Sequence, residues 1–121
     1  MSRPSTKTNP LLINLITDLK KQAYEQEAPI WKDIATRLEK PAKNWPVVTL
    51  DRISKYINDN ETALIPGKVL STGTLTKKVS IAAWDFSDKS LDKIKKAGGK
   101  SLSIQEVLKA NPKGKDIRIL G

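Results

Sequence analysis

The chain has 121 residues, a net charge of +9, and neither Cys nor His. The absence of these two residue types excludes disulfides, Cys/His zinc sites, thiol catalysis and the commonest general base. A strongly basic domain favours a polyanionic partner, and no apolar run approaches the roughly 20 residues of a membrane-spanning helix. We therefore expect a nucleic-acid partner, no membrane association and no secretory signal.

The first segment of the chain, residues 1–9, predicts a flexible basic tail. Arg3 and Lys7 stand among Ser, Thr, Asn and Pro with no acid, so both are expected to order only against a partner. Residues 10–121 are expected to form one domain. Its helical part covers residues 10–60, and its strand-containing core covers residues 61–121.

Three helices are predicted within residues 10–60. Asn9 suits an N-cap and Pro10 suits the first helical position. A second helix is expected from Pro29 to Pro41, and Thr49 is expected to cap a third. Apolar residues at helical spacing define their inner faces. These residues are Leu12, Leu15, Ile16, Leu19 and Ala23 in the first helix, Trp31, Ile34, Ala35 and Leu38 in the second, and Leu50, Ile53 and Ile57 in the third.

Short strands are predicted next. Residues 62–65 and 68–70 are apolar and are expected to form two strands separated by Pro66-Gly67. Residues 78–84 alternate as a strand does, and residues 117–120 form an expected last strand. Together with the helices, these strands indicate a mixed α/β fold.

Two further helices are predicted between the strands. Ser87 precedes a helix whose inner face is expected to contain Leu91, Ile94 and Ala97, and Gly98-Gly99 ends it. Ser103 and Glu106 have the spacing of a capping box, which predicts a short helix up to Asn111-Pro112.

The positive charge is concentrated in four stretches of the chain. Residues 40–55, 66–78, 86–100 and 109–121 each carry a net +3, whereas residues 18–39 carry a net −1. Three of the four include turns rich in Gly, Pro, Asn or Ser, which allow Lys side chains to reach separate phosphates. Several basic loops suit an irregular RNA surface, although any single Lys could serve solubility alone. The contacts expected from charge and loop position are Lys43, Lys55, Lys77, Lys78, Lys100 and Lys115.

Catalysis is not expected, because the carboxylates are scattered and the glycines form no phosphate-binding motif of known spacing. No cofactor, metal or small-molecule substrate is therefore predicted. Trp45 lies in a basic connector, where it could stack on a base or ribose, but packing at the domain edge is the favoured interpretation.

A winged-helix domain that binds duplex DNA is an alternative. Three helices followed by a β-hairpin have that order, with Arg52 and Lys55 in the recognition helix and Lys77-Lys78 in the wing. Two features count against it. The chain after Ser87 has no place in that plan, and the third helix offers few residues for reading base edges.

Several motifs occur in a recognisable order. Residues 69–75, Lys78-Val79, Phe86-Ser87 and residues 93–99 resemble the core of the bacterial large-subunit ribosomal protein numbered fifteen. Further motifs make the whole chain, from about residue 7 to residue 120, more similar to the archaeal and eukaryotic large-subunit ribosomal protein eighteen-e family. These motifs are Lys7-Thr8-Asn9-Pro10, Leu38-Glu39-Lys40-Pro41, Arg52-Ile53, residues 66–70 and Asn111-Pro112-Lys113-Gly114. The compact length resembles the archaeal members.

The resemblance implies N-terminal helices followed by an irregular superhelical core of ββα-like turns with short strands. It also implies a cytoplasmic, structural protein of the large ribosomal subunit that binds and stabilises folded ribosomal RNA beside neighbouring ribosomal proteins. The family has no active site to carry over. The matching basic positions, which the resemblance indicates as phosphate contacts, are Lys7, Lys40, Arg52, Lys68 and Lys113.

Overall fold

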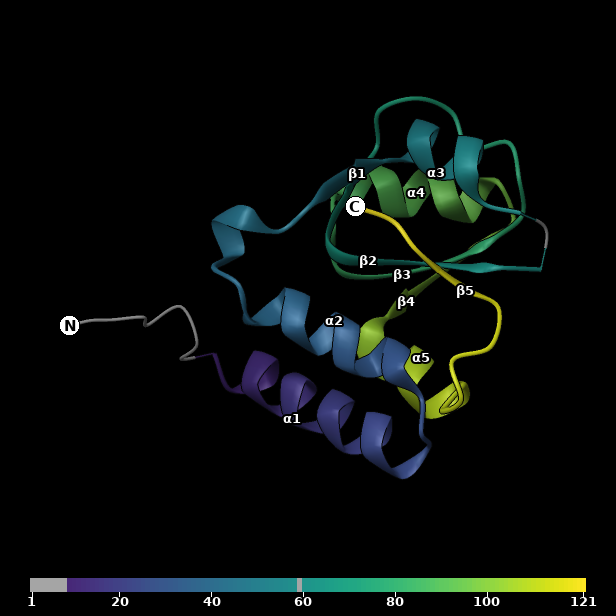
Figure 1. Cartoon of the computed structure of the whole chain (residues 1–121). Coiled ribbons are helices and arrows are strands. Elements are labelled where there is room, and N and C mark those ends of the chain that lie inside the picture. The colour runs from purple at the N-terminus through teal and green to yellow at the C-terminus, as the bar shows by residue number, and fades with distance from the viewer. Residues whose placement is uncertain (1–8, 59) are drawn as a thin grey trace.

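The computed structural model describes residues 9–58 and 60–121, in which helices cover both faces of a five-stranded sheet (Figure 1). Helices α3 and α4 lie on one face, and α1, α2 and α5 lie on the other. The elements are, in order, α1 (Pro10–Glu25), α2 (Pro29–Glu39), the 3-10 helix η2 (Ala42–Asn44), β1 (Val47–Thr49), α3 (Leu50–Tyr56), β2 (Thr62–Leu70), β3 (Ser80–Phe86), α4 (Asp88–Lys96), β4 (Lys100–Ser103), α5 (Ile104–Ala110) and β5 (Ile117–Ile119).

Strand β2 is the centre of the sheet, and every strand pair is parallel. One side of β2 pairs with β3, which in turn pairs with the edge strand β4. The other side of β2 has two partners, β5 at residues 62–64 and β1 at residues 68–70. Because the strands are parallel, β1, β3 and β4 lead directly into α3, α4 and α5 at the same edge of the sheet.

The core has two parts, one on each face of the sheet. Leu64 and Ala82 face the helices α1, α2 and α5, whereas their neighbours in β2 and β3 face α3 and α4. This division follows from the period of two along a strand. A parallel sheet buried on both faces needs nearly continuous apolar strands, and residues 63–65 and 81–83 supply them.

The sequence predicted the helix starts correctly. The side chains of Asn9, Thr49 and Ser87 accept hydrogen bonds from the first turns of α1, α3 and α4. Ser103 and Glu106 form the predicted capping box of α5. The mixed α/β class with N-terminal helices is confirmed, as is the burial of Trp31.

The predicted break at Pro66-Gly67 is wrong, because β2 continues through both residues. Its register with β3 shifts between Ile65 and Lys68, and this irregularity accommodates a proline that has no N–H to donate. The short strands β1 and β4 were not predicted, and β3 begins two residues later than expected, at Ser80.

Two further expectations are corrected. Leu91 is 38% exposed, and Ser90 takes its place on the inner face of α4, where its hydroxyl donates a hydrogen bond to the carbonyl oxygen of Ser87. The β-hairpin that a winged-helix domain requires is absent between β2 and β3, since these strands are parallel. The winged-helix alternative therefore lacks its wing.

Candidate nucleic-acid interface

Helices α3 and α4 present basic side chains to solvent on one face of the molecule. In α4 the buried positions are Ser90 and Ile94, so all four of its lysines are exposed. In α3 the buried positions are Leu50 and Ile53, which leaves Arg52 and Lys55 exposed. We call the outer surface of α3, α4 and the loop of residues 71–79 the α3–α4 face.

The loop of residues 71–79 is fixed between the two helices. The Lys93 ammonium on α4 donates to the carbonyl oxygens of Ser71 and Gly73, both at 2.8 Å. On the α3 side, the Asp51 N–H donates to the Thr72 carbonyl at 3.1 Å. The half-buried Lys77 donates to the Ile57 carbonyl, at the C-cap of α3, at 2.7 Å. These bonds give the basic loop a defined position.

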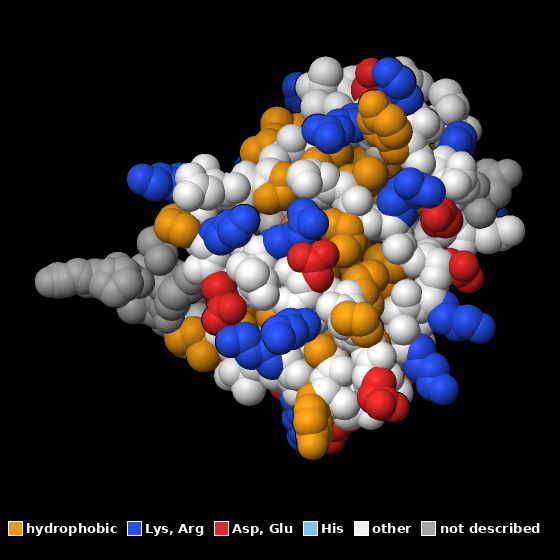
Figure 2. All heavy atoms as spheres, viewed as in Figure 1, with side chains coloured by type: hydrophobic (Ala, Val, Ile, Leu, Met, Phe, Trp, Pro, Cys, Tyr) orange, Lys and Arg blue, Asp and Glu red, His pale blue; other side chains and the backbone are white. Residues whose placement is uncertain are grey.

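Charge is segregated between the two helical layers. The α3–α4 face carries eight basic and three acidic side chains, whereas α1, α2 and α5 together carry five of each. Acidic and basic side chains stand beside one another over α1 and α2 (Figure 2), where Lys20 pairs with Glu39 at 2.8 Å and Arg37 with Asp33 at 3.1 Å. We call α1, α2 and α5 the neutral layer, because their charges balance. This layer attracts a polyanion weakly, whereas the α3–α4 face attracts it strongly.

Four of the predicted contacts lie on the α3–α4 face: Arg52, Lys55, Lys77 and Lys78. Lys100 adjoins it, because its N–H donates to the Val79 carbonyl at 3.0 Å. The side chains of Arg52 and Lys78 make no ion pair or hydrogen bond within the part of the chain that the structure describes. Both are therefore available to phosphates.

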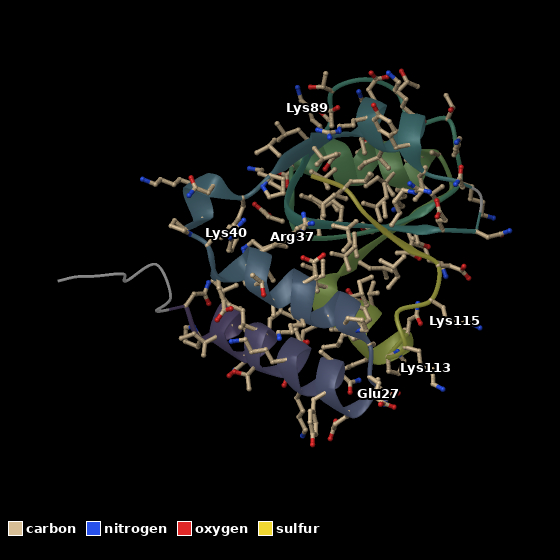
Figure 3. All side chains as sticks on the ribbon, viewed as in Figure 1. Glu27, Arg37, Lys40, Lys89, Lys113 and Lys115 are labelled. Carbon is tan, nitrogen blue, oxygen red and sulfur yellow. The ribbon has the colours of Figure 1, made fainter. Side chains whose placement is uncertain are left out.

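The other predicted contacts are not brought together with these. Lys113 and Lys115 lie at one end of the molecule in the loop before β5, far from Lys40 at the other end (Figure 3). Lys43 belongs to η2, in the connector that follows Lys40. Arg3 and Lys7 lie outside the described residues. The predicted contacts therefore form one cluster on the α3–α4 face, and the other predicted cations lie apart from it.

Hydrogen bonds hold the Lys113–Lys115 loop against α2. The indole N–H of Trp31 donates to the Pro112 carbonyl at 2.7 Å, and Gly114 adopts a φ of 70°. The Asn111 amide side chain bonds both backbone groups of Lys115, accepting from its N–H at 3.1 Å and donating to its carbonyl at 2.7 Å. Both lysine side chains are exposed.

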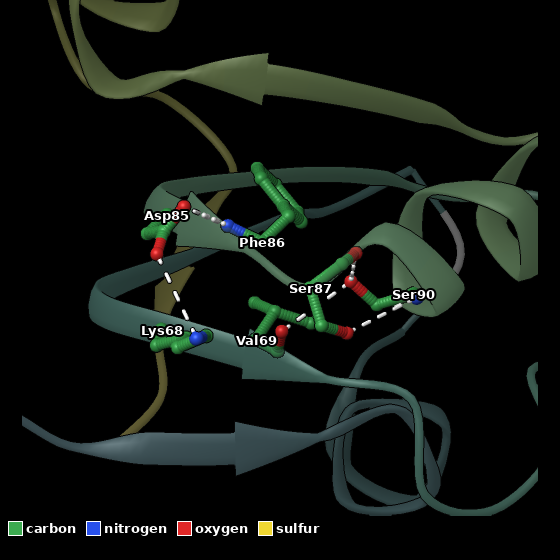
Figure 4. Close-up of polar contacts among 6 residues, drawn as sticks. All are labelled: Lys68, Val69, Asp85, Phe86, Ser87 and Ser90. Atoms are coloured by element: carbon green, nitrogen blue, oxygen red, sulfur yellow. Dashed lines mark hydrogen bonds and ion pairs between the residues drawn. The ribbon is translucent and has the colours of Figure 1, made fainter.

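Lys68 is tied to the carboxyl end of the sheet. Its ammonium lies 3.8 Å from the Asp85 carboxylate, and the pair joins β2 to β3 (Figure 4). The same close-up shows Ser90 bonded to the carbonyl oxygen of Val69, which fixes the start of α4 beside β2. Lys68 is exposed, but part of its charge is compensated within the protein.

Sequence reasoning missed Lys89, Lys93, Lys95 and Lys96 as individual candidates. Their stretch was recognised as basic, but only Lys100 was named from it. The predicted inner face of the helix after Ser87 could have identified them. The four lysines do not share the face of Ile94, so they are exposed to solvent. Among the described residues, the side chains of Lys89 and Lys95 make no hydrogen bond or ion pair, whereas Lys96 pairs with Asp92 at 3.0 Å.

Trp45 packs against the protein, as the favoured interpretation of the sequence had it. Its ring meets that of Trp84 edge to face with centroids 5.9 Å apart, and its indole N–H donates to the Lys40 carbonyl at 3.0 Å. The ring therefore fixes the basic connector of Lys40 and Lys43 to the sheet.

Glu61 fastens the last strand to the centre of the sheet. Its carboxylate accepts from the Arg118 guanidinium at 2.9 Å and from the Asn58 N–H at 2.8 Å. The hydrogen bond from Arg118, followed by that from Asn58, lowers the pKa of Glu61 below its ordinary value of 4.5.

Within residues 9–58 and 60–121, no group of three or more His, Cys, Asp and Glu side chains is placed to hold a metal ion. No helix in this described part is long and apolar enough to cross a membrane.

Residues 2–121 match the family model described as "Ribosomal protein 60S L18 and 50S L18e". The chain belongs to this L18/L18e family. It is 48% identical over 120 residues to the large ribosomal subunit protein eL18 of Methanoregula boonei, a comparison that covers 99% of both chains. The eL18 proteins of Methanothermobacter thermautotrophicus and Archaeoglobus fulgidus are 43% and 45% identical, over 99% and 94% of this chain and 99% and 97% of theirs.

The L18e membership confirms the resemblance to the eighteen-e family, including its archaeal character, whereas the resemblance to the bacterial protein numbered fifteen stays a prediction. It gives the chain a structural role in the large ribosomal subunit. The family match covers residues 2–121, so it includes the segments that form both helical layers and the sheet between them.

Proposed function

We propose that this L18e-family chain binds and stabilises folded large-subunit ribosomal RNA, with the α3–α4 face as its principal contact surface. The segregation of charge between the helical layers carries the proposal. Cations that are fixed on one face and unpaired displace the counterions around RNA phosphates, which supplies a large part of the binding free energy. The chain acts as a scaffold for these charges and is not an enzyme.

The outlying cations extend the contact beyond this face. Lys40 lies far from Lys113 and Lys115 (Figure 3). Lys43 lies in the connector after Lys40, and Lys68 lies on β2. Folded RNA presents phosphates in many directions, so such an arrangement suits RNA that wraps around the protein. Arg3 and Lys7 complete the proposed set of phosphate contacts.

A titration of deproteinised large-subunit ribosomal RNA with the full chain tests the proposal. The variant replaces Lys78, Lys89 and Lys95 with Gln. We expect its affinity to fall at least about tenfold at 150 mM salt, and the slope of log affinity against log salt to fall by about two, because each lost phosphate contact removes about 0.7–0.9 from that slope.

A matched variant provides the control. Replacing Lys21, Lys32 and Lys109 with Gln removes the same charge from exposed, unpaired positions of α1, α2 and α5. We expect its affinity to stay within about threefold of the parent's, since long-range attraction is screened beyond about 8 Å. Equal losses in the two variants would contradict the α3–α4 face as the principal contact. Tighter binding of the parent to a short DNA duplex than to this RNA would contradict RNA recognition altogether.

A further inference from the structure

One part of the surface differs chemically from the rest of this basic chain. Two adjoining hollows, with volumes of about 450 and 280 Å³, share the residues Ala83, Trp84, Asp85 and Ser103 as walls. Leu11 of α1 borders the first, and Leu91 of α4 borders the second. We call the two together the β3–β4 groove.

The groove is largely apolar, and none of the described basic side chains lines it. Leu11 is 72% and Leu91 38% exposed, and the rings of Trp84 and Phe86 are only partly buried. The charged residue in the lining is Asp85, which borders both hollows. Lys68 lies beside the groove, 3.8 Å from Asp85, but it does not line either hollow. An apolar lining whose charged member is an acid is poorly suited to RNA phosphates.

Strand β4 runs along this groove as the edge of the sheet. Its strand partner is β3, and its outer side has no strand among the described residues. Ser101, Leu102 and Ser103 of β4 also line the second hollow. An edge strand offers N–H and C=O groups to another extended chain, and adjacent pockets then select that chain's side chains.

We infer that the β3–β4 groove binds an extended, basic segment of another large-subunit protein. This inference rests on the proposed function, because it takes the chain to be part of the assembled subunit. The occupant lies along β4, places an apolar side chain between Leu11, Trp84 and Leu91, and brings a Lys or Arg to the Asp85 carboxylate. Asp85 can accept this second cation for two reasons. Its side chain is 59% exposed, and its present partner, Lys68, is 3.8 Å away, which is a long distance for an ion pair.

Site-specific photo-cross-linking in purified large subunits tests the inference. The full chain carries p-benzoylphenylalanine in place of Leu11 or of Leu91, and in a control in place of Tyr24, which is 87% exposed near the far end of α1. We expect both groove positions to cross-link to one segment of another protein in which Lys and Arg outnumber Asp and Glu. The Tyr24 position is expected not to reach that segment.

A second variant tests the charge that recognises the occupant. Asp85→Lys in the Leu91-labelled chain is expected to lower the yield of this cross-link at least fivefold. Asp88→Asn, which changes an acid outside the groove lining, is expected to leave the yield within twofold of the parent's.

Several outcomes would overturn the inference alone, with the chain still incorporated into subunits. They are no cross-link from the groove positions, cross-links only to RNA or to residues 1–8 of the same chain, and cross-links to a neutral or acidic segment. An unchanged yield in the Asp85→Lys variant would also overturn it. Failure of the chain to enter large subunits would overturn the proposed function as well, so the two failures are distinguishable.

Discussion

Lys77 illustrates how one cation can serve the fold as well as a surface. Its ammonium donates to the Ile57 carbonyl at 2.7 Å, at the C-terminal end of α3, where a positive charge also favours the helix dipole. We expect Lys77→Met to lower the free energy of unfolding by about 1 kcal/mol, as measured by urea denaturation. Lys78→Met, at the exposed neighbouring position, is the control and should change it by less than about 0.5 kcal/mol. Equal losses of unfolding free energy in the two variants would show that the hydrogen bond from Lys77 to the Ile57 carbonyl does not stabilise the fold.

Glu61 predicts a pH dependence of stability. Its pKa is lower in the folded than in the unfolded chain, so the unfolded state takes up the proton more readily as the pH falls. The stabilisation is therefore complete above the ordinary value of 4.5 and is lost as the pH drops through the lowered pKa. We expect Glu61→Gln to unfold at lower urea concentration than the parent at pH 7, and the gap to narrow as the pH falls below 4.5.

The control for this pH dependence is Asp33→Asn. It breaks an exposed pair within a single helix, and such pairs contribute about 0.5 kcal/mol or less. A gap between Glu61→Gln and the parent that is as wide at pH 3 as at pH 7 would count against the Arg118–Glu61 contact as its source.

At the scale of elements, Pro66-Gly67 marks the place where β2 changes partners. Before it, β2 pairs with β5, and after it, with β1. The Lys68 N–H donates to the Pro46 carbonyl at 3.1 Å, just before β1 begins. A Cβ on Gly67 would collide with the same carbonyl oxygen. Gly67 is therefore required, because the backbone just before β1 comes this close.

This geometry predicts the cost of a single methyl group. Gly67→Ala is expected to lower the free energy of unfolding by about 2–3 kcal/mol, because backbone must move to accept the Cβ. Gly98→Ala is the comparison. Its Cβ would have ordinary contacts with Lys78, and the penalty comes from a φ of 81°, worth about 1 kcal/mol. A thermal or urea unfolding series in which Gly98→Ala is the more damaging change would contradict the close approach at Gly67.

The same elements show what the sequence could predict. Helix periodicity and caps are local, so Asn9, Thr49, Ser87 and the Ser103–Glu106 box were sufficient to place four helix starts. Strand pairing is not local. The strands β1 and β4, which were not predicted, are only three and four residues long, and each is stabilised by a partner from another part of the chain, β1 by β2 and β4 by β3. Pro66-Gly67 was misinterpreted for the same reason, because a local rule for turns cannot include a distant carbonyl.

At the scale of the whole molecule, the sequence could predict which stretches carry the positive charge of the candidate interface. It could not predict which of these stretches lie together on one face. The basic stretches were visible in the sequence, but the fold decides that residues 52–55, 77–78 and 89–96 lie on one face, because hydrogen bonds join α3, the loop of residues 71–79 and α4. Lys40 and Lys113 lie away from this face and from each other. The balanced charge of α1, α2 and α5 was partly visible in the net −1 of residues 18–39. The division into a neutral and a basic layer required the parallel sheet between them.

This division has a consequence for the free protein. The cations of the α3–α4 face repel one another when no polyanion is bound, whereas those of the α1–α2 layer lie among carboxylates. The Lys78, Lys89 and Lys95 to Gln variant should therefore melt about 2–4 °C above the parent at low ionic strength, as expected for relief of about 0.5–1 kcal/mol. The difference should shrink in about 0.5 M KCl, because salt screens the same repulsion.

Calorimetry at both salt concentrations checks this prediction. The control is the Lys21, Lys32 and Lys109 to Gln variant, which is expected to melt at or below the parent's Tm. If the Lys78, Lys89 and Lys95 to Gln variant melted at a lower temperature than the parent at low salt, these lysines would stabilise the free fold. Binding of RNA would then not be needed to explain why they cluster.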